Sequence, residues 1–311
     1  MSNNELHDIL SYLESETPLP KIVVVYGPTA CGKSSLAVNI ALSLRTRGYG
    51  SEIISADSRQ IYSWLDIGTG KVTTDEMQWI PHHMLDVISP DITYSMVDYR
   101  KWVDTLELWQ DTHIIPILCG WTGLYIDAVL YDMDYPDTPP DWEYRAELEA
   151  IRTKYWDQRL WDMLYQVDPT YASELEVENY RYVMRGLEVM RATGRSKKDA
   201  ENTKKLRFSP YFITPYTDSV ENRKQLYANI DKRVESMFNY WLLEEVIYNE
   251  TIYSDTSPGL STIGYKEVCS YLRGESTLEV AKALVAQHSR NYAKRQITWN
   301  KKYAFINSTD N

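Results

Sequence analysis

Eight consecutive residues, 27–34, read Gly-Pro-Thr-Ala-Cys-Gly-Lys-Ser and fit the phosphate-binding pattern G-x-x-x-x-G-K-[ST]. The glycines let the backbone turn so that successive N–H groups face one anion, and the helix that follows adds partial positive charge. Lys33 supplies a full charge, and the Ser34 hydroxyl can hold Mg2+ or a phosphate oxygen. A site for a diphosphate or polyphosphate is therefore predicted. Its contacts are Gly27, Pro28, Thr29, Ala30, Cys31, Gly32, Lys33 and Ser34.

A second group of reactive side chains is Asp-Ser-Arg-Gln at 57–60. Many P-loop hydrolases hold Mg2+ through an acid that ends a hydrophobic strand, and the apolar run before Asp57 ends in such an acid, whereas the run ending at Cys119 does not. Asp57 could instead accept a proton while Ser58 and Gln60 orient the edge of a base. A helix cap or simple support of Mg2+ is the alternative reading of Asp57.

Further turns carry groups that can contact anions or bases. Gly-Thr-Gly-Lys at 68–71 places a cation beside backbone amides, and Gly-Trp-Thr-Gly-Leu-Tyr at 120–125 follows an apolar run and opens a helical pattern. The motif Tyr-Ser-Met-Val-Asp-Tyr at 94–99 is typical of a helix start. Each motif alone is also consistent with ordinary capping, so only their combination is informative.

The elements that must position these groups alternate along the first 130 residues. Apolar, β-branched runs predict strands at 22–26, 52–57, 83–88 and 113–119. Helical patterns lie between or after them, at 35–44, 99–110 and 122–131. The alternation predicts an α/β fold, with a P-loop NTPase-like parallel sheet flanked by helices. Ligands are expected at the carboxyl ends of the strands.

A Pro- and Asp-rich break at 132–140 interrupts this alternation. The pattern is helical throughout 142–193, a strand is expected to return to the sheet at 206–215, and two long helices are expected at 219–250 and 278–300. The predicted organisation is an acidic N-terminal extension at 1–20, a catalytic core formed by 21–131 and 208–311, and an inserted all-helical domain at 132–207.

The composition is that of a globular cytoplasmic enzyme. The chain has 311 residues, of which 43% are hydrophobic and 25% charged, and no apolar run approaches the roughly 20 residues that cross a bilayer. The first twenty residues hold four acids and no Lys or Arg, which argues against a signal or transit peptide. Three cysteines, Cys31, Cys119 and Cys269, lie far apart, as in a reducing compartment.

The net charge of −11 argues against nucleic acid for the molecule as a whole, but the charge is uneven. Residues 191–207 hold seven basic side chains against two acids, and 290–302 hold five with no acid. Because screening acts over about 8 Å at physiological salt, a local basic face can still bind phosphates. Two solvated helical faces are the alternative explanation of these stretches.

Taken in chain order, the motifs resemble the tRNA dimethylallyltransferase (isopentenyl-tRNA transferase) family. The resemblance rests on 27–34, 57–62, 68–71, 94–99 and 120–125, and on His-His-Met-Leu-Asp at 82–86. It continues through Val-Asp-Pro-Thr-Tyr-Ala at 167–172, Arg-Tyr-Val-Met-Arg-Gly-Leu-Glu-Val at 181–189, Thr-Ile-Gly-Tyr-Lys-Glu at 262–267 and Tyr-Ala-Lys-Arg-Gln-Ile-Thr-Trp at 292–299. It spans roughly residues 20–302, nearly the whole chain.

The resemblance implies transfer of a dimethylallyl group from dimethylallyl diphosphate to the exocyclic N6 amine of adenosine 37 in tRNA, with Mg2+ as cofactor and Ser34 as its protein ligand. By similarity Asp57 is the base that accepts the amine proton. Arg233 matches the family's diphosphate-contacting arginine, Arg223 is the alternative, and a solvated helix residue is the other reading of Arg233. The implied catalytic set is Asp57, Thr29, Lys33 and Arg233.

The resemblance also implies contacts with the tRNA anticodon stem-loop, a helical insert that clamps the stem, and a monomer with no membrane association. A surface ion pair is the alternative for Arg145. The implied tRNA contacts are Asp57, Ser58, Arg59, Gln60, Lys71, Thr122, Arg145, Arg181, Arg185, Gly264, Lys266, Lys294, Arg295, Gln296 and Trp299.

Three positions depart from the family pattern: Trp121 replaces a glycine, Val72 a proline, and Tyr182 the second of two arginines. They bear on the placement of the allyl tail and on one phosphate contact, not on the reaction. The rival readings are an adenylate isopentenyltransferase that makes free cytokinin-type nucleotides, a P-loop nucleotide or metabolite kinase, and an RNA-binding module with a degenerate loop. The intact Lys-Ser pair at 33–34 argues against the last of these.

Overall fold

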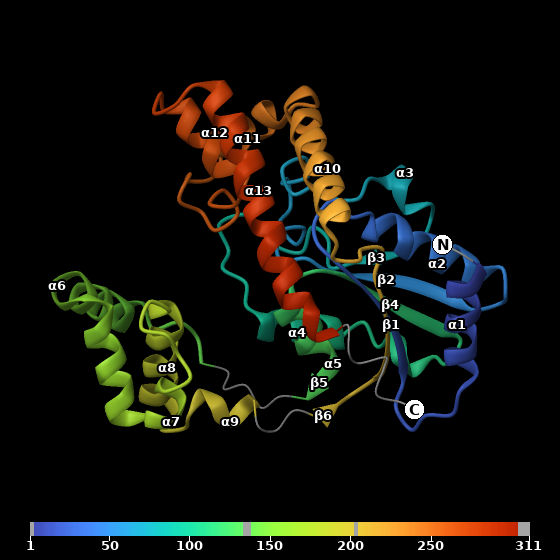
Figure 1. Cartoon of the computed structure of the whole chain (residues 1–311), viewed down its shortest axis with the longest axis horizontal. Helices are drawn as coiled ribbons and strands as arrows, with labels where there is room; N and C mark the ends of the chain where they lie inside the picture. Colours follow the sequence, from blue (N-terminus) through green and yellow to red (C-terminus); the bar gives the residue numbers. More distant parts are fainter. Residues whose placement is uncertain (1–2, 133–137, 202–204, 304–311) are drawn as a thin grey trace. The chain divides into compact units, whose positions relative to one another are not determined.

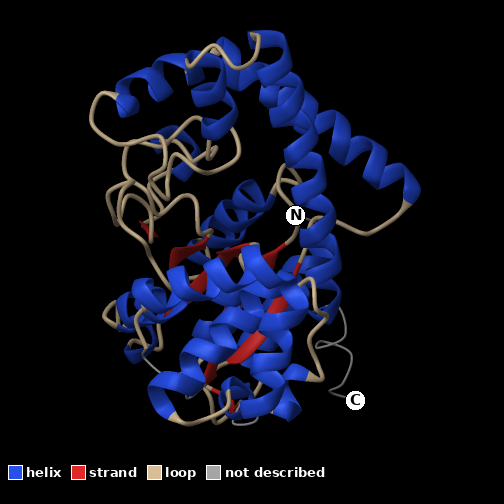
Figure 2. Ribbon diagram, turned by 90° about the vertical axis from the view of Figure 1, so that its left-hand side faces the viewer, coloured by secondary structure: helices blue, strands red, loops and turns tan. Residues whose placement is uncertain are grey.

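A computed structural model describes residues 3–132, 138–201 and 205–303 of the chain. The chain divides into two compact units. One unit combines Met1–Leu130 with Arg207–Asn311, and the other is Tyr131–Leu206. The second unit is thus an insertion in the sequence of the first. Helix makes up far more of the chain than strand (Figure 2).

Five strands of the first unit form one parallel sheet, in the order β3-β2-β4-β1-β7. They are β1 (Lys21–Tyr26), β2 (Gly50–Ala56), β3 (His82–His83), β4 (Ile114–Gly120) and β7 (Ser209–Ile213). Val and Ile dominate the buried positions of β1 and β4, as is typical of strands covered on both faces. The predicted α/β fold with a helix-flanked parallel sheet is confirmed.

One face of the sheet is covered by α1 (Asn3–Glu14) and α2 (Lys33–Arg45), as Figure 1 shows. Ile9 and Leu13 of α1 join buried residues of α2 and of the strands in one hydrophobic cluster. The backbone N–H of Ile22 donates to the Tyr12 phenol oxygen at 2.9 Å, which ties α1 to β1. The stretch expected as an acidic extension at 1–20 therefore contributes a helix to the core.

The other face carries α4 (Met96–Asp104) and α5 (Gly123–Leu130) (Figure 1). The Tyr99 and Tyr125 rings stack with centroids 4.0 Å apart, and the Tyr99 hydroxyl donates to the carbonyl oxygen of Ser55 at 2.8 Å. The bond ties α4 to β2 two residues before Asp57, and the stacked rings join α5 to α4.

Four helices near the carboxyl terminus stand together above the sheet in Figure 1. They are α10 (Val220–Asn239), α11 (Leu242–Glu250), α12 (Tyr265–Leu272) and α13 (Leu278–Asn300). Ile230 and Val234 of α10 pack against Val285 and Ile297 of α13. Among the described residues, no helix is both long enough and apolar enough to span a membrane.

Several predicted elements differ from the structure. The helix expected at 99–110 begins at Met96 and ends at Asp104. The strand expected at 83–88 is limited to β3, because Met84 and Asp86 take positive φ angles of 64° and 55° that end the extended backbone. The helix expected at 219–250 is divided into α10 and α11 at Trp241, whose φ is 75°. The remaining short elements are α3 (Thr74–Met77) and 3-10 turns at Leu108–Gln110 and Lys301–Tyr303.

The insert was predicted to be all-helical, and this is wrong in one detail: among its described residues, the second unit also has one short β-ribbon where the chain enters and leaves it. Its helices are α6 (Trp142–Val167), α7 (Pro169–Ala172), α8 (Tyr180–Thr193) and α9 (Lys197–Glu201), and its strands β5 (Tyr131–Asp132) and β6 (Lys205–Leu206) pair antiparallel. Leu148, Leu160 and Leu164 of α6 pack against Val183 and Leu187 of α8. Helix α6 is kinked at Trp156, where φ is 68°.

Candidate active site

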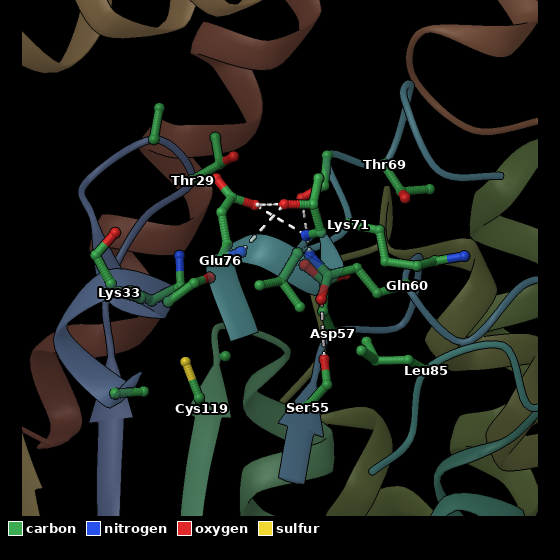
Figure 3. Close-up of a pocket in the computed structure, with 18 of the residues that line it drawn as sticks. Thr29, Lys33, Ser55, Asp57, Gln60, Thr69, Lys71, Glu76, Leu85 and Cys119 are labelled. Atoms are coloured by element: carbon green, nitrogen blue, oxygen red, sulfur yellow. Dashed lines mark hydrogen bonds between the residues drawn. The ribbon is translucent and has the colours of Figure 1, made fainter. Parts of the chain in front are cut away.

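A cavity of about 680 Å³ opens where β1, β2 and β4 end. Lys33 reaches it from the turn after β1, Asp57 follows β2, and Arg233 enters from α10. Figure 3 shows Lys33 and Asp57 on either side of this space, above the strand ends. A cation and a carboxylate from separate strands therefore face one cavity.

The phosphate loop, residues 27–34, is a tight turn between β1 and α2. Gly27 and Gly32 have φ angles of 148° and 92°, which other residues rarely adopt, and Ala30 has a φ of 61°. The Lys33 ammonium donates to the carbonyl oxygen of Pro28 at 2.8 Å, so it lies over the loop. Because the first amides of a helix have no partner within it, the start of α2 offers N–H groups to an anion.

Gln296 supports this loop from α13. Its side-chain carbonyl accepts the backbone N–H of Thr29 at 2.7 Å, and the residue is 1% exposed. The sequence reading placed Gln296 on tRNA, but a side chain buried to this degree has no surface to offer an RNA. Its contact instead orders the loop that is expected to hold the diphosphate.

The Asp57 carboxylate is held at both oxygens. Its Oδ1 accepts the backbone N–H of Arg59 at 2.9 Å, and its Oδ2 accepts the indole N–H of Trp121 at 2.9 Å. The first bond closes a turn over 57–60 rather than capping a helix, because no helix begins there. The end of β4 can lie this close to the end of β2 because residue 120 is glycine: a Cβ there would lie 2.3 Å from the carbonyl oxygen of Ala56.

Three residues that were predicted to contact the tRNA lie close to Asp57 in the sequence or across the strand ends: Ser58, Gln60 and Thr122. The Thr122 hydroxyl oxygen accepts the backbone N–H of Ser58 at 3.0 Å, which joins the end of β2 to the start of α5. The Gln60 carbonyl accepts from the Ser55 hydroxyl at 3.1 Å, and its amide donates to Gly70 at 3.2 Å. Both ends of the Gln60 side chain are therefore engaged within the protein.

Arg233 is the guanidinium of the cavity. It donates to the carbonyl oxygens of Thr69 and Gly70 at 3.3 and 3.1 Å and lies 3.4 Å from the Thr29 hydroxyl. Burial lowers the pKa of Arg233, and within the described part of the chain no carboxylate is close enough to form an ion pair with it. A partly buried cation without an ion-pair partner is a strong site for an anion.

Arg223, the alternative arginine, lies ten residues earlier on α10 and is not part of the cavity wall. Its guanidinium makes two bonds to the Asp218 carboxylate, at 2.6 and 2.7 Å. Of the two arginines, the structure brings only Arg233 to Lys33 and Asp57.

The segment 66–71 is fixed by helices α11 and α12. The backbone N–H groups of Asp66, Ile67 and Gly68 all donate to the Glu245 carboxylate, at 2.8–3.1 Å, and the buried Tyr265 hydroxyl donates to the same group at 2.5 Å. This network holds Thr69 and Gly70 where their carbonyls receive Arg233.

Lys71 lines the cavity but is internally paired. Its ammonium contacts Asp66 and Asp86 at 2.5 and 2.6 Å, and its side chain is 6% exposed. This lysine therefore closes the 66–71 turn, and the predicted contact with tRNA would require those two ion pairs to open.

Replacing Glu245 by alanine should destabilise the protein by about 3 kcal/mol, because three backbone amides and a buried phenol lose a charged acceptor. The matched control is Glu244→Ala on the same helix, whose side chain is exposed. Chemical denaturation of both variants measures the difference. Equal stabilities would show that Glu245 does not hold the 66–68 amides.

Arg59 is half-buried in the turn over 57–60, and the other core residues predicted to contact tRNA lie on or next to α12 and α13. Lys294 and Arg295 are exposed, and Lys266 is 47% exposed beside Glu267. Gly264 has a φ of 100° and starts α12 by donating its N–H to Glu267 at 2.7 Å. Trp299 is 40% exposed and packs so closely on α5 that only glycine fits at position 123.

In the second unit, Arg145 and Arg185 share one buried carboxylate. Arg145 makes bonds of 2.6 and 2.8 Å to Glu188, and Arg185 lies 3.4 Å from the same group. The ion pair considered as the alternative for Arg145 is present, although Glu188 is the buried partner. Arg181 is exposed, with its guanidinium 5.8 Å from the ring centroid of Tyr180.

The cavity wall also holds Thr69, His82 and Leu85, which belong to the motifs at 68–71 and 82–86, and Glu76, which was not among the predicted site residues. Burial lowers the pKa of His82, so its imidazole stays neutral at pH 7. The one sequence signal at Glu76 is the Thr-x-x-Glu pattern of a capping box, which the structure shows at the start of α3. Within the described ranges, no three His, Cys, Asp or Glu side chains are grouped to hold a metal ion.

Comparison with known proteins agrees with this arrangement. The family model described as IPP transferase matches residues 60–303, and the model described as isopentenyl transferase matches 20–93. The tRNA dimethylallyltransferases of Caldanaerobacter subterraneus subsp. tengcongensis and Thermoanaerobacter pseudethanolicus are each 38% identical to the chain over 291 residues, covering 92% of it and 90% of the relative.

Two solved structures are similar. The tRNA isopentenylpyrophosphate transferase of Bacillus halodurans is 35% identical, with a TM-score of 0.63 over 91% of this chain and 87% of that one. A eukaryotic dimethylallyltransferase acting on tRNA is 26% identical, with a TM-score of 0.74 over 90% of this chain and 69% of that one. With the phosphate loop, Asp57 and Arg233 gathered at one cavity, the chain belongs to the IPP transferase family.

Proposed function

We propose that this chain transfers a dimethylallyl group from dimethylallyl diphosphate to the exocyclic N6 amine of adenosine 37 in tRNA. The observation that carries the proposal is the meeting of Asp57 with Lys33 and Arg233 at one cavity. The two cations suit a diphosphate, and the carboxylate suits an amine that must lose a proton. We further propose that the enzyme acts as a cytoplasmic monomer.

In the proposed reaction the N6 nitrogen forms a bond to the allylic carbon as the bond from that carbon to the diphosphate oxygen breaks. The amine is a poor nucleophile, and Asp57 accepts the proton that it loses. Negative charge grows on the diphosphate, where the amides of the phosphate loop, the Lys33 ammonium and the Arg233 guanidinium stabilise it. The Thr29 hydroxyl, 3.4 Å from Arg233, lies beside the same charge.

The residues of the cavity fit a magnesium ion that is held mainly by the substrate. Mg2+ keeps several waters and takes one or two protein oxygens together with phosphate oxygens. Ser34 lines the cavity, and its hydroxyl is the protein oxygen proposed for the ion. When bound, Mg2+ would neutralise part of the charge on the leaving diphosphate.

The exposed basic side chains of α13, Lys294 and Arg295, are proposed to contact tRNA phosphates. A base inside a stem-loop must leave its stack to reach a carboxylate at the floor of a cavity. On the second unit, Arg181 is the exposed candidate, whereas Arg145 and Arg185 are proposed to shape the RNA-facing surface through their shared partner, Glu188.

Replacing Lys294 and Arg295 together by alanine should weaken tRNA binding. The slope of log Kd against log salt should fall by about 1.5, because binding without these two phosphate contacts releases fewer counterions. Lys282→Ala is the matched control, since this exposed lysine lies on the same helix, over the Phe238 ring. Titrations at several salt concentrations measure the slope. If the loss of affinity does not depend on salt concentration, neither residue contacts a phosphate.

The function is tested by incubating the protein with Mg2+, dimethylallyl diphosphate and unmodified tRNA. One adenosine should gain one C5H8 unit, which mass spectrometry of the digested tRNA locates. A gain on free AMP but not on tRNA would indicate an adenylate isopentenyltransferase. Consumption of ATP alone would indicate a kinase.

A further inference from the structure

Trp121 lies against the carboxylate that the proposed reaction uses as its base. The residue directly follows β4, and its backbone N–H donates to the carbonyl oxygen of Ala56 at 3.3 Å. Its indole N–H donates to Oδ2 of Asp57 at 2.9 Å. The ring meets Tyr292 of α13 edge to face, with centroids 4.3 Å apart and planes at 70°. Backbone and ring are thus both fixed, and the indole has one orientation toward Asp57.

The indole N–H is the side-chain hydrogen-bond donor at this carboxylate among the described residues. Oδ1 is already bonded to a backbone amide, that of Arg59, at 2.9 Å. Among the described residues, Trp121 is the one side chain that donates a hydrogen bond to Asp57. Each carboxylate oxygen has two lone pairs, so one on each oxygen stays available for a substrate.

We infer that Trp121 is a positioning residue for prenyl transfer: its indole N–H fixes the Asp57 carboxylate in the orientation that accepts the proton of the incoming amine. The inference rests on the proposed function, in which Asp57 is the base. The indole keeps its own proton throughout.

The test replaces Trp121 by phenylalanine, which keeps an aromatic ring against Tyr292 but lacks the N–H. The value of kcat should fall by about 10-fold, with the KM for dimethylallyl diphosphate nearly unchanged. Trp79→Phe is the control for the exchange itself, since Trp79 is 92% exposed.

An unchanged kcat in Trp121→Phe, or a loss seen only as a higher KM for dimethylallyl diphosphate, would overturn the inference, because a residue that orients the base acts on kcat. The hydrogen bond is also measured without catalysis, from the indole N–H resonance of Trp121 in a 15N-labelled protein. That resonance should move upfield in Asp57→Ala, and an unchanged shift would contradict the bond even if Trp121→Phe fails to fold. An active Asp57→Ala enzyme would instead overturn the proposed function.

Discussion

Asp57→Ala should transfer the dimethylallyl group about 1,000-fold more slowly than the wild type, because general base catalysis contributes roughly 100- to 10,000-fold. Binding of tRNA should change by less than about twofold, since one carboxylate gives little of an affinity that phosphate contacts dominate. Single-turnover rates with radiolabelled dimethylallyl diphosphate measure the first effect. Filter binding of tRNA measures the second.

Glu76 provides the matched control, because it is another carboxylate in the wall of the same cavity. Glu76→Gln keeps the shape of the side chain and leaves Asp57 in place. Transfer by this variant should stay within about fivefold of the wild type. If Glu76→Gln loses transfer and Asp57→Ala does not, the base is Glu76. Equal loss of transfer and tRNA binding in Asp57→Ala would make Asp57 a structural residue.

Arg233→Gln should lower kcat/KM for dimethylallyl diphosphate by about 100- to 1,000-fold, the range typical for one donor that stabilises charge developing in the transition state. The guanidinium has no ion-pair partner within salt-bridge distance among the described residues, although the Asp57 and Glu76 carboxylates act on it from farther away, so it can bind an anionic ligand directly. The side chain also bonds to the carbonyls of Thr69 and Gly70, so part of the loss will come from a looser 66–71 segment.

Arg223→Gln separates these effects from a general change on α10. Its guanidinium is occupied by Asp218 and is absent from the cavity wall, so the variant should keep kcat/KM within about twofold. Steady-state kinetics of the two variants decide between the arginines. A larger loss in Arg223→Gln would assign the diphosphate to the other end of the helix and would contradict the cavity as the diphosphate site.

The chemistry of the phosphate loop could be predicted from sequence, because residues 27–34 make their anion site from their own backbone. The parallel sheet could be predicted as well, since buried β-branched runs that alternate with helical patterns are compatible with few other folds. Asp57 could be proposed for a related reason. Residues that follow parallel strands lie at one edge of the sheet, so an acid after β2 must lie near a loop after β1.

Only the tertiary structure decided how these groups are held. The bond between Thr29 and Gln296 joins residues 267 positions apart, and the bond between Asp57 and Trp121 joins residues 64 apart. No local pattern in the sequence marks such pairs, because each depends on where separate elements pack. The choice between Arg223 and Arg233 is similar, since two arginines on one helix look alike until Asp218 is found beside the first.

Local sequence patterns also did not predict two features of the fold: the break between α10 and α11, and the early end of β3. Each depends on a residue in a positive-φ conformation, Trp241 in one case and Met84 in the other, which neither residue type favours by itself. Packing of the surrounding elements selects those conformations. The sequence by itself thus determined the reactive groups and the strand ends that carry them, whereas tertiary packing decided which side chains orient them, because orientation comes from contacts between distant segments.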